Sequence, residues 1–349
     1  MKRYLDYFWP LLGLTASLYS VHLLFEKLRA EASTDPAVRA LLAHSDLWTS
    51  IKIIFGEIGE KLGAIPAHSY GLAFASTLTA YAALAWYDRI ALMHLRRQKD
   101  ISLLYAAGCS FVTYAMSHNI GASVFSGGVV RLRAYTAKGL NTGEVAVLVA
   151  LCSFTFAFGT ILLLGITLIL EPHILEPLSS LSRHFSIGPT AARLIGLALI
   201  GFCMLYTLGA SLRLRPLKIG DFRIVYPRLL IVALQYIASP MELMGAAGII
   251  YFALPWDMNP GFGVVLGAFL LSFSAGLLSQ VPGGVGVMEA VFLAVMPGVP
   301  AASVFAALLV WRLFYLLLPL AMSIPMIIIF ERSQMGKATK GMKAPPGSH

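Results

Sequence analysis

Long apolar runs separated by short polar stretches dominate the pattern of this chain. An α-helix needs about 20 consecutive apolar residues to cross the hydrocarbon core of a bilayer. The first run follows Met1-Lys2-Arg3, as in a signal peptide, but it is too long and has no small-x-small cleavage site, so we interpret it as an uncleaved helix. The fold class is therefore an all-α polytopic membrane protein. Six full membrane-spanning helices are predicted at about 6 to 25, 66 to 88, 144 to 170, 189 to 209, 225 to 253 and 301 to 330.

Two further apolar segments, 101 to 134 and 262 to 297, are each interrupted by glycines. Their second arms, about 122 to 134 and 284 to 297, are short and glycine-rich for a full span. Two full crossings would satisfy the same topology, but the pattern favours re-entrant hairpins. Irregular backbone at membrane depth needs protein or a water-filled cavity around it. The hairpin turns therefore predict a cavity.

Lysines and arginines gather in some of the short connections, which predicts that these connections face the cytoplasm. Under this rule both termini are cytoplasmic, the first hairpin opens to the inside and the second to the outside. The basic, inside segments are 88 to 100, 210 to 223 and the tail, and the outside segments are 26 to 63, 171 to 188 and 254 to 261.

The order helix, hairpin, helix occurs twice, at about 66–170 and 225–330, in opposite predicted orientations. Broken segments at matching places in two inverted halves are typical of a transport site near the midplane. We expect a single membrane domain, 1–332, followed by a basic, flexible cytoplasmic tail, 333–349. Residues 47–62 have apolar side chains at helical spacing, which predicts an interfacial helix lying flat on the membrane.

The first hairpin carries candidate ligands for a lipid phosphate. If the return arm is helical from Gly127 and Gly128, Arg131 lies about 6 Å and Arg133 about 9 Å from the turn. Arginine binds phosphate bidentately, and free N–H groups at a helix start, with Asn119 nearby, would add donors. The two arginines point apart, so we expect one of them to face the cavity. The alternative is that both anchor the arm at the interface.

The second hairpin places a carboxylate one helical turn after a glycine-rich break. Ionised side chains at this depth need a partner or a function. The obvious partner of Glu289 is Arg312, which lies roughly 17 Å into the last helix. The two residues would form a structural ion pair, contact the substrate, or do both. Glu242, beside Pro240, would either line the cavity or bond the backbone N–H groups freed by the proline. The break itself consists of Pro282, Gly283, Gly284 and Gly286.

Composition narrows the functional class. The chain is 58% hydrophobic and 12% charged, which excludes a soluble enzyme, and its formal net charge of +9 is explained by basic cytoplasmic loops without nucleic acid. The cysteines are isolated, and neither a metal motif, a catalytic triad nor a GxxxxGK[ST] loop is present. We expect no metal, no cofactor and no ATP hydrolysis in this chain.

Three stretches, HNIGASVFSGGVVRLRAY, VPGGVGVMEAVF and WRLFYLLLPLA, give the sequence a resemblance to a known family. It resembles the transmembrane region of lysylphosphatidylglycerol synthetases, the lipid-translocating half of the multiple peptide resistance factor. This resemblance implies a flippase of aminoacylated phosphatidylglycerol, such as lysyl-phosphatidylglycerol, in the bacterial cytoplasmic membrane. It also implies that Arg131, Arg133, Glu289 and Arg312 occupy the family's polar positions.

The bifunctional members of that family continue into an aminoacyl-transferase domain, which is absent from this sequence. A stand-alone member and a piece of a longer protein both fit, and the Gly347-Ser348-His349 ending is typical of a cloning remnant. Two other functions stay open: a lipid-presenting subunit of a separate transferase, and a transporter of another polar or polyprenyl-linked lipid. The expected partners are the phospholipid, the membrane, a separately encoded lipid aminoacyl-transferase and further copies of the chain.

Overall fold

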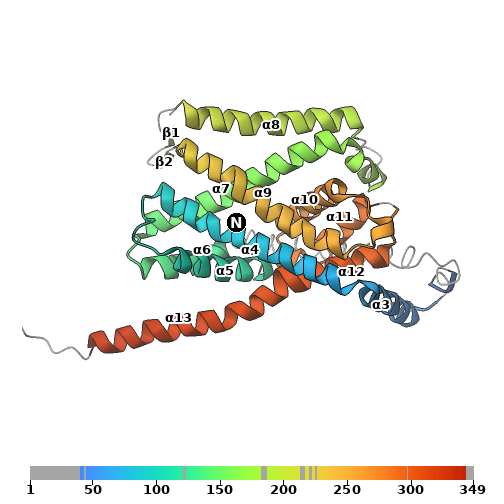
Figure 1. Ribbon diagram of the computed structural model, residues 1–349, viewed down its shortest axis with the longest axis horizontal. Coiled ribbons are helices and arrows are strands. Elements are labelled where there is room, and N and C mark those ends of the chain that lie inside the picture. The colour runs from blue at the N-terminus through green and yellow to red at the C-terminus, as the bar shows by residue number, and fades with distance from the viewer. Residues whose placement is uncertain are drawn as a thin grey trace, which may run out of the picture.

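The computed structural model describes residues 40–42, 45–120, 123–181, 187–212, 217–219, 222–224, 226–296 and 298–342. The helix expected at about 6 to 25 lies outside these residues. The described part is an elongated body of packed helices, which confirms the all-α class (Figure 1). Its strands β1 (Leu217–Ile219) and β2 (Phe222–Ile224) form one short antiparallel hairpin.

The order helix, helical hairpin, helix occurs twice along the chain. The first set consists of α4 (Ala67–His94), the pair α5 (Leu103–Ile120) and α6 (Ser123–Thr136), and α7 (Thr142–Leu170). The second set consists of α9 (Leu229–Ala253), the pair α10 (Phe262–Leu278) and α11 (Val287–Val295), and a last helix built of α12 (Ala301–Trp311), a π-helical segment (Arg312–Leu317) and α13 (Leu318–Met342). Outside both sets lie α3 (Leu47–Ala64), the 3₁₀ segment Pro172–Leu181, and α8 (Pro189–Ser211).

Four described helices are long and apolar enough to cross a membrane: Thr142–Leu170, Pro189–Ser211, Leu229–Ala253 and Ala301–Phe330. They coincide with four of the six spans expected from the sequence. Helix α4 has 28 residues but does not reach the same hydropathy, and it continues six residues past the expected end at 88. A multi-pass membrane protein follows from these helices, and the total of six spans stays a prediction.

Small residues allow the helices that begin the two sets to approach closely. Helix α9 brings Gly245 and Gly248 against Ser76 and Ala80 of α4. A Cβ atom at Gly245 would lie 2.9 Å from both the Ala80 nitrogen and the Ser76 oxygen, so only glycine fits there. Since lipid offers no hydrophobic drive for helix association, such close backbone contacts are a main source of stability in membranes. The α4–α9 pair therefore forms the main helix contact between the two sets.

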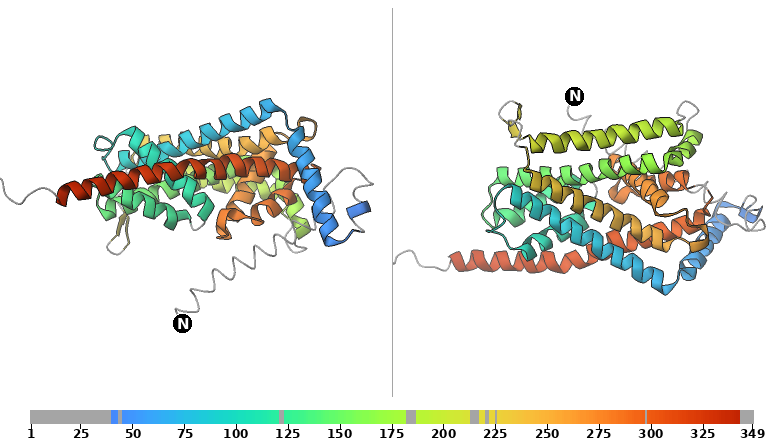
Figure 2. Two further views of the ribbon diagram at one scale, coloured as in Figure 1. Left: turned by 90° about the horizontal axis from the view of Figure 1, so that it is seen from below. Right: turned by 45° about the horizontal axis from the view of Figure 1, so that its top comes forward.

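The two helical hairpins, α5–α6 and α10–α11, lie toward opposite ends of the body (Figures 1 and 2). Helix α5 contacts the short 3₁₀ turn Pro282–Gly284, which joins α10 to α11. Helix α8 covers one edge beside α7, and α13 runs along the opposite edge and projects beyond it (Figure 1). The re-entrant placement of the hairpins in a membrane stays a prediction.

A bidentate ion pair fastens the α4–α5 loop to the start of α7. The Arg97 guanidinium donates to Glu144 from Nε at 2.8 Å and from Nη2 at 3.2 Å. The Glu144 carboxylate also accepts from the Asn141 N–H, while the Asn141 side chain accepts from the Glu144 N–H. We call this arrangement the loop ion pair.

The ends of the described chain differ in part from the expectations. Helix α3 is present where the interfacial helix was expected, with Trp48 and Phe55 exposed and Ile58 buried against the body. Its position relative to a membrane stays a prediction. Helix α13 continues through Met342, into the segment 333–349 that was expected to be a basic, flexible cytoplasmic tail, and the flexibility and the cytoplasmic side of this segment stay predictions.

Candidate functional site

A narrow cleft lies between the end of α5 and the turn of the second hairpin. Its cavity volume is about 30 Å³, and the space rises to about 440 Å³ when the open mouth is counted. The end of α5 supplies Ser117 and His118, and the second hairpin supplies Gly276, Gln280 and its glycine turn. Trp311 and Leu316 of the last helix close the remaining wall. A small cleft is therefore present beside the second turn, and the larger cavity between both hairpin turns stays a prediction.

The turn of the second hairpin depends on glycine. Gly283, Gly284 and Gly286 have φ values of 61°, 61° and 82°, in the left-handed region that side chains disfavour. A Cβ atom at Gly284 would lie 3.2 Å from the Gly276 Cα, so α10 and the turn also pack closely. The expected break at Pro282–Gly286 is therefore where the chain reverses, and it forms one rim of the cleft.

Glu289 and Arg312 are in contact, as their depth suggested. Arg312 Nε donates to Glu289 Oε1 at 2.6 Å, and Arg312 Nη1 donates to the Gly283 carbonyl at 3.0 Å. Glu289 also accepts from the Gly286 N–H at 2.8 Å, which caps the start of α11. The glutamate is 3% exposed. This pair holds the glycine turn against the last helix beside the cleft.

The last helix widens into a π-helical segment at Arg312–Leu317, next to the cleft. π-Segments leave backbone groups without their usual helical partners and recur at functional sites. Here two side chains bond to its carbonyls: Tyr81 donates to the Tyr315 carbonyl at 2.9 Å, and Asn119 donates to the Leu316 carbonyl at 3.1 Å. Asn119 was expected near a lipid phosphate, whereas here its amide ties the first hairpin to the last helix.

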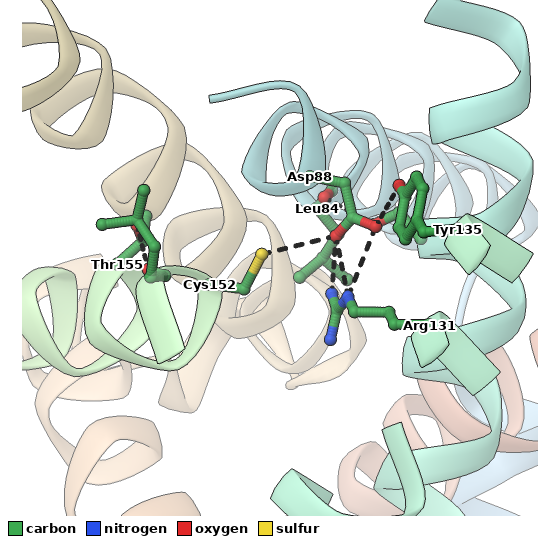
Figure 3. A network of polar contacts seen from close by, with 8 residues as sticks. Leu84, Asp88, Arg131, Tyr135, Cys152 and Thr155 are labelled. Carbon is green, nitrogen blue, oxygen red and sulfur yellow. Dashed lines mark hydrogen bonds and ion pairs between the residues drawn. The ribbon is translucent and has the colours of Figure 1, made fainter. Parts of the chain in front are cut away.

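A second buried ion pair links the first hairpin to α4. Arg131 donates to the Asp88 carboxylate, with Nη2 2.6 Å from Oδ1 (Figure 3). Its guanidinium also lies over the Tyr114 ring. Tyr135 donates to the other carboxylate oxygen at 2.6 Å, and Cys152 of α7 lies 3.4 Å from Oδ1 (Figure 3). Asp88 is fully buried and Arg131 is 4% exposed. Three elements, α4, α6 and α7, thus meet at one carboxylate.

This arrangement changes the roles expected in the first hairpin. Arg131 is held by Asp88 and is not open to a lipid phosphate, while Arg133 is exposed, so the two arginines do point apart. Helix α6 begins at Ser123, so Gly127 and Gly128 lie inside a helix and do not form its start as expected. Gly127 instead permits close packing on α5, since a Cβ atom there would lie 3.0 Å from a Thr113 methyl carbon.

Glu242 lies at the centre of the body and is fully buried. Its carboxylate accepts hydrogen bonds from the hydroxyls of Tyr315, in the π-helical segment, and Tyr87, in α4. From the sequence, Glu242 was expected either to line the cavity or to bond the backbone N–H groups freed by Pro240. The observed partners are two tyrosines, so Glu242 links α4 to the π-helical segment beside the cleft.

Sequence reasoning missed Asp88 and the tyrosines that bond to the buried carboxylates. Hydropathy falls at Tyr87-Asp88-Arg89, so Asp88 was placed in a loop although α4 continues to His94. A helical extension of α4 would have put Asp88 at membrane depth and demanded a cationic partner. Within the described residues no cluster of histidine, cysteine and carboxylate side chains could hold a metal ion.

Comparison with known proteins places these features in a family. The family model described as lysylphosphatidylglycerol synthase TM region matches residues 37–323. The uncharacterized protein slr0712 of Synechocystis sp. is 30% identical over 75% of this chain and 79% of its own length. The inner membrane protein YbhN of Escherichia coli is 30% identical over 64% of this chain and 68% of its own length.

A third relative is the phosphatidylglycerol lysyltransferase of Staphylococcus haemolyticus, which is 33% identical over 91 residues. The match covers 25% of this chain and only 11% of that protein. The cleft, both hairpins and both buried ion pairs lie within the residues that the family model matches. The chain therefore belongs to the family of the lysylphosphatidylglycerol synthase transmembrane region.

Proposed function

We propose that this protein is a flippase that moves phosphatidylglycerol, including its aminoacylated forms, between the leaflets of a bacterial cytoplasmic membrane. The observation that carries the proposal is the cleft between two helical hairpins from matching positions of the two sets. Family membership supports it, and the names of two relatives refer to the inner membrane and to phosphatidylglycerol lysyl transfer.

The cleft has hydrogen-bond donors for a lipid head group. Within the described part of the chain, the Trp311 indole nitrogen and His118 Nδ1 have no hydrogen-bond partner, although both are buried. An unpaired buried polar atom is costly, so a head-group oxygen or hydroxyl that reached these atoms as the cleft opened would remove that cost. Ser117 and Gln280 line the same space. The head group would occupy this polar space while the acyl chains stay in the lipid.

The buried ion pairs would let each hairpin move as one unit with its neighbouring helix. Glu289–Arg312 joins the second turn to the last helix, and Asp88–Arg131 joins α6 to α4. Broken elements at the same place in two halves suit alternate opening to each side of a membrane. In this scheme Arg133, exposed on α6, meets the lipid phosphate at the membrane surface before the head group enters.

Leaflet assays test the proposal directly. The purified chain is placed in vesicles with lysyl-phosphatidylglycerol, and an impermeant amine-reactive reagent scores the outer-leaflet fraction over time. Transport at the rate of protein-free vesicles would contradict a flippase. It would favour the rival function, a subunit that presents lipid to a separate transferase.

One substitution links transport to the cleft. His118→Phe keeps a ring that can pack on Tyr315, whose centroid lies 5.3 Å away, but removes the polar nitrogens. Loss of a hydrogen bond to a charged group costs about 1.5 to 3 kcal/mol, so we expect translocation to slow by roughly ten- to a hundredfold. The matched control is His173→Phe, at a residue that lies outside the cleft with its side chain 70% exposed.

A further inference from the structure

A second cleft lies where the end of α3 meets the start of α4, and it shares no lining residue with the cleft between the hairpins. The end of α9 and the start of α12 complete its walls. Its cavity volume is about 200 Å³, and the space rises to about 780 Å³ when the open mouth is counted. It is therefore the more spacious of the two clefts, and the translocation scheme does not use it.

The polar end of this cleft is electropositive. Lys61 and His68 line it, and no carboxylate is among its lining residues. Helices α4 and α12 both begin here, with Pro66 and Pro300 as N-caps and without a side-chain cap for either helix. Helix starts carry a partial positive charge and free N–H groups. The charges and the helix ends all favour an anion.

Ser303, in the first turn of α12, gives an independent indication of a ligand. It is 4% exposed and lines the cleft. Its N–H bonds to the Pro300 carbonyl, but no described residue hydrogen-bonds to its hydroxyl, whose oxygen keeps some accessible surface at the cleft although the residue is largely buried. The hydroxyl of a largely buried serine normally has a partner. A phosphate oxygen in the cleft would supply one.

The rest of the cleft is apolar and open. Trp256 is 73% exposed, Leu72 is 44% exposed, and Phe252 also lines the cleft. Tryptophan is typical of the membrane–water interface, where its ring lies at head-group level. An anion site that continues into apolar side chains matches an amphiphile better than a soluble anion.

We propose that this cleft is a second lipid site that holds an anionic glycerophospholipid. The phosphate lies between Lys61, Ser303 and the two helix starts, and an acyl chain follows Leu72 and Phe252. The site does not depend on translocation, so it stands or fails independently of the flippase proposal. Its effect would be to fix α3 against the body at the membrane surface.

Trp256 is a built-in reporter for the test. The full chain is placed in vesicles that contain either phosphatidylglycerol or phosphatidylcholine with brominated acyl chains, at equal mole fractions. Bromine quenches nearby indoles, and the quenching that disappears in Trp256→Phe belongs to this residue. We expect brominated phosphatidylglycerol to bind with an apparent association constant several-fold above that of brominated phosphatidylcholine.

Lys61→Gln should lower that preference by about fivefold, since a lysine near anionic lipid contributes about 1 kcal/mol. The matched control is Lys52→Gln, on the same helix but outside the cleft, where Lys52 lies over the Trp48 ring. Ser303→Ala should also weaken the preference. Equal quenching by the two lipids, a preference that survives Lys61→Gln, or an equal loss in Lys52→Gln would each overturn the proposal.

Discussion

Neutralising Asp88 should destabilise the protein strongly, because it strands a buried arginine. Asp88 is fully buried, and Arg131, its partner, is 4% exposed with Nη2 2.6 Å from the carboxylate. Asp88→Asn keeps the shape of the side chain but leaves the guanidinium charge without a counter-ion. Removing one member of a buried pair typically costs about 3 to 5 kcal/mol. We expect Asp88→Asn to lower the free energy of unfolding by this amount.

Two comparator variants separate charge from hydrogen bonding. Tyr135→Phe removes only the hydroxyl that donates to Asp88, and a hydrogen bond to a charged group contributes about 1.5 to 3 kcal/mol. Arg133→Ala removes an exposed arginine two residues from Arg131, where exposed ion pairs contribute about 0 to 1 kcal/mol. The expected order of destabilisation is therefore Asp88→Asn, Tyr135→Phe, Arg133→Ala.

The assay is unfolding of the purified chain in mixed micelles, followed by tryptophan fluorescence. The double variant Asp88→Asn with Arg131→Gln should lose less than the sum of the two single variants, by roughly 1 to 3 kcal/mol. Strictly additive losses would refute a direct pair. So would an Asp88→Asn variant no less stable than Arg133→Ala.

Three further predictions concern packing, pH and the central carboxylate. Gly245→Ala should lower the free energy of unfolding by about 1 to 3 kcal/mol, because the added Cβ meets the backbone of α4. Gly128→Ala is the control: it has open space around it and should not destabilise the protein, and unfolding in micelles compares the two variants. The loop ion pair needs an ionised Glu144, and acid protonates carboxylates. Stability measured against pH should therefore separate Glu144→Gln from the parent near neutrality and bring the two together in acid. Tyr315→Phe removes a hydroxyl that bonds Glu242 and should cost about 1.5 to 3 kcal/mol, a prediction that an unchanged unfolding midpoint would contradict.

Features governed by local chemistry could be predicted from the sequence. Hydropathy located the spans at α7, α8, α9 and the last helix to within a few residues. The Pro-Gly-Gly break marked the second turn, because positive φ values need glycine. A charged side chain deep in a membrane needs a partner, and Glu289 and Arg312 are each isolated charges in an apolar stretch. This rule predicted their pairing, which the structure shows.

Features governed by packing between distant segments could not be predicted in the same way. Arg131 lies 43 residues from Asp88, and nothing local marks the two as partners. Glycine occurs both in turns and where two helices pack closely, and the sequence around Gly127 does not distinguish the two. In the structure Gly127 lies at a close contact between helices. Tyr87 and Tyr315 resemble core aromatics, and only the fold brings their hydroxyls to Glu242.

Accessibility from the two sides of the membrane tests the central claim, that the hairpins open a shared cleft in opposite directions. Single cysteines at 125 and 285 are introduced after the buried Cys109, Cys152 and Cys203 are replaced, and small impermeant thiol reagents are added to oriented vesicles from one side at a time. The account predicts that position 125 reacts from the cytoplasmic side and position 285 from the outer side. Reaction of both positions from the same side, or labelling of the 136 to 142 loop from outside, would contradict it.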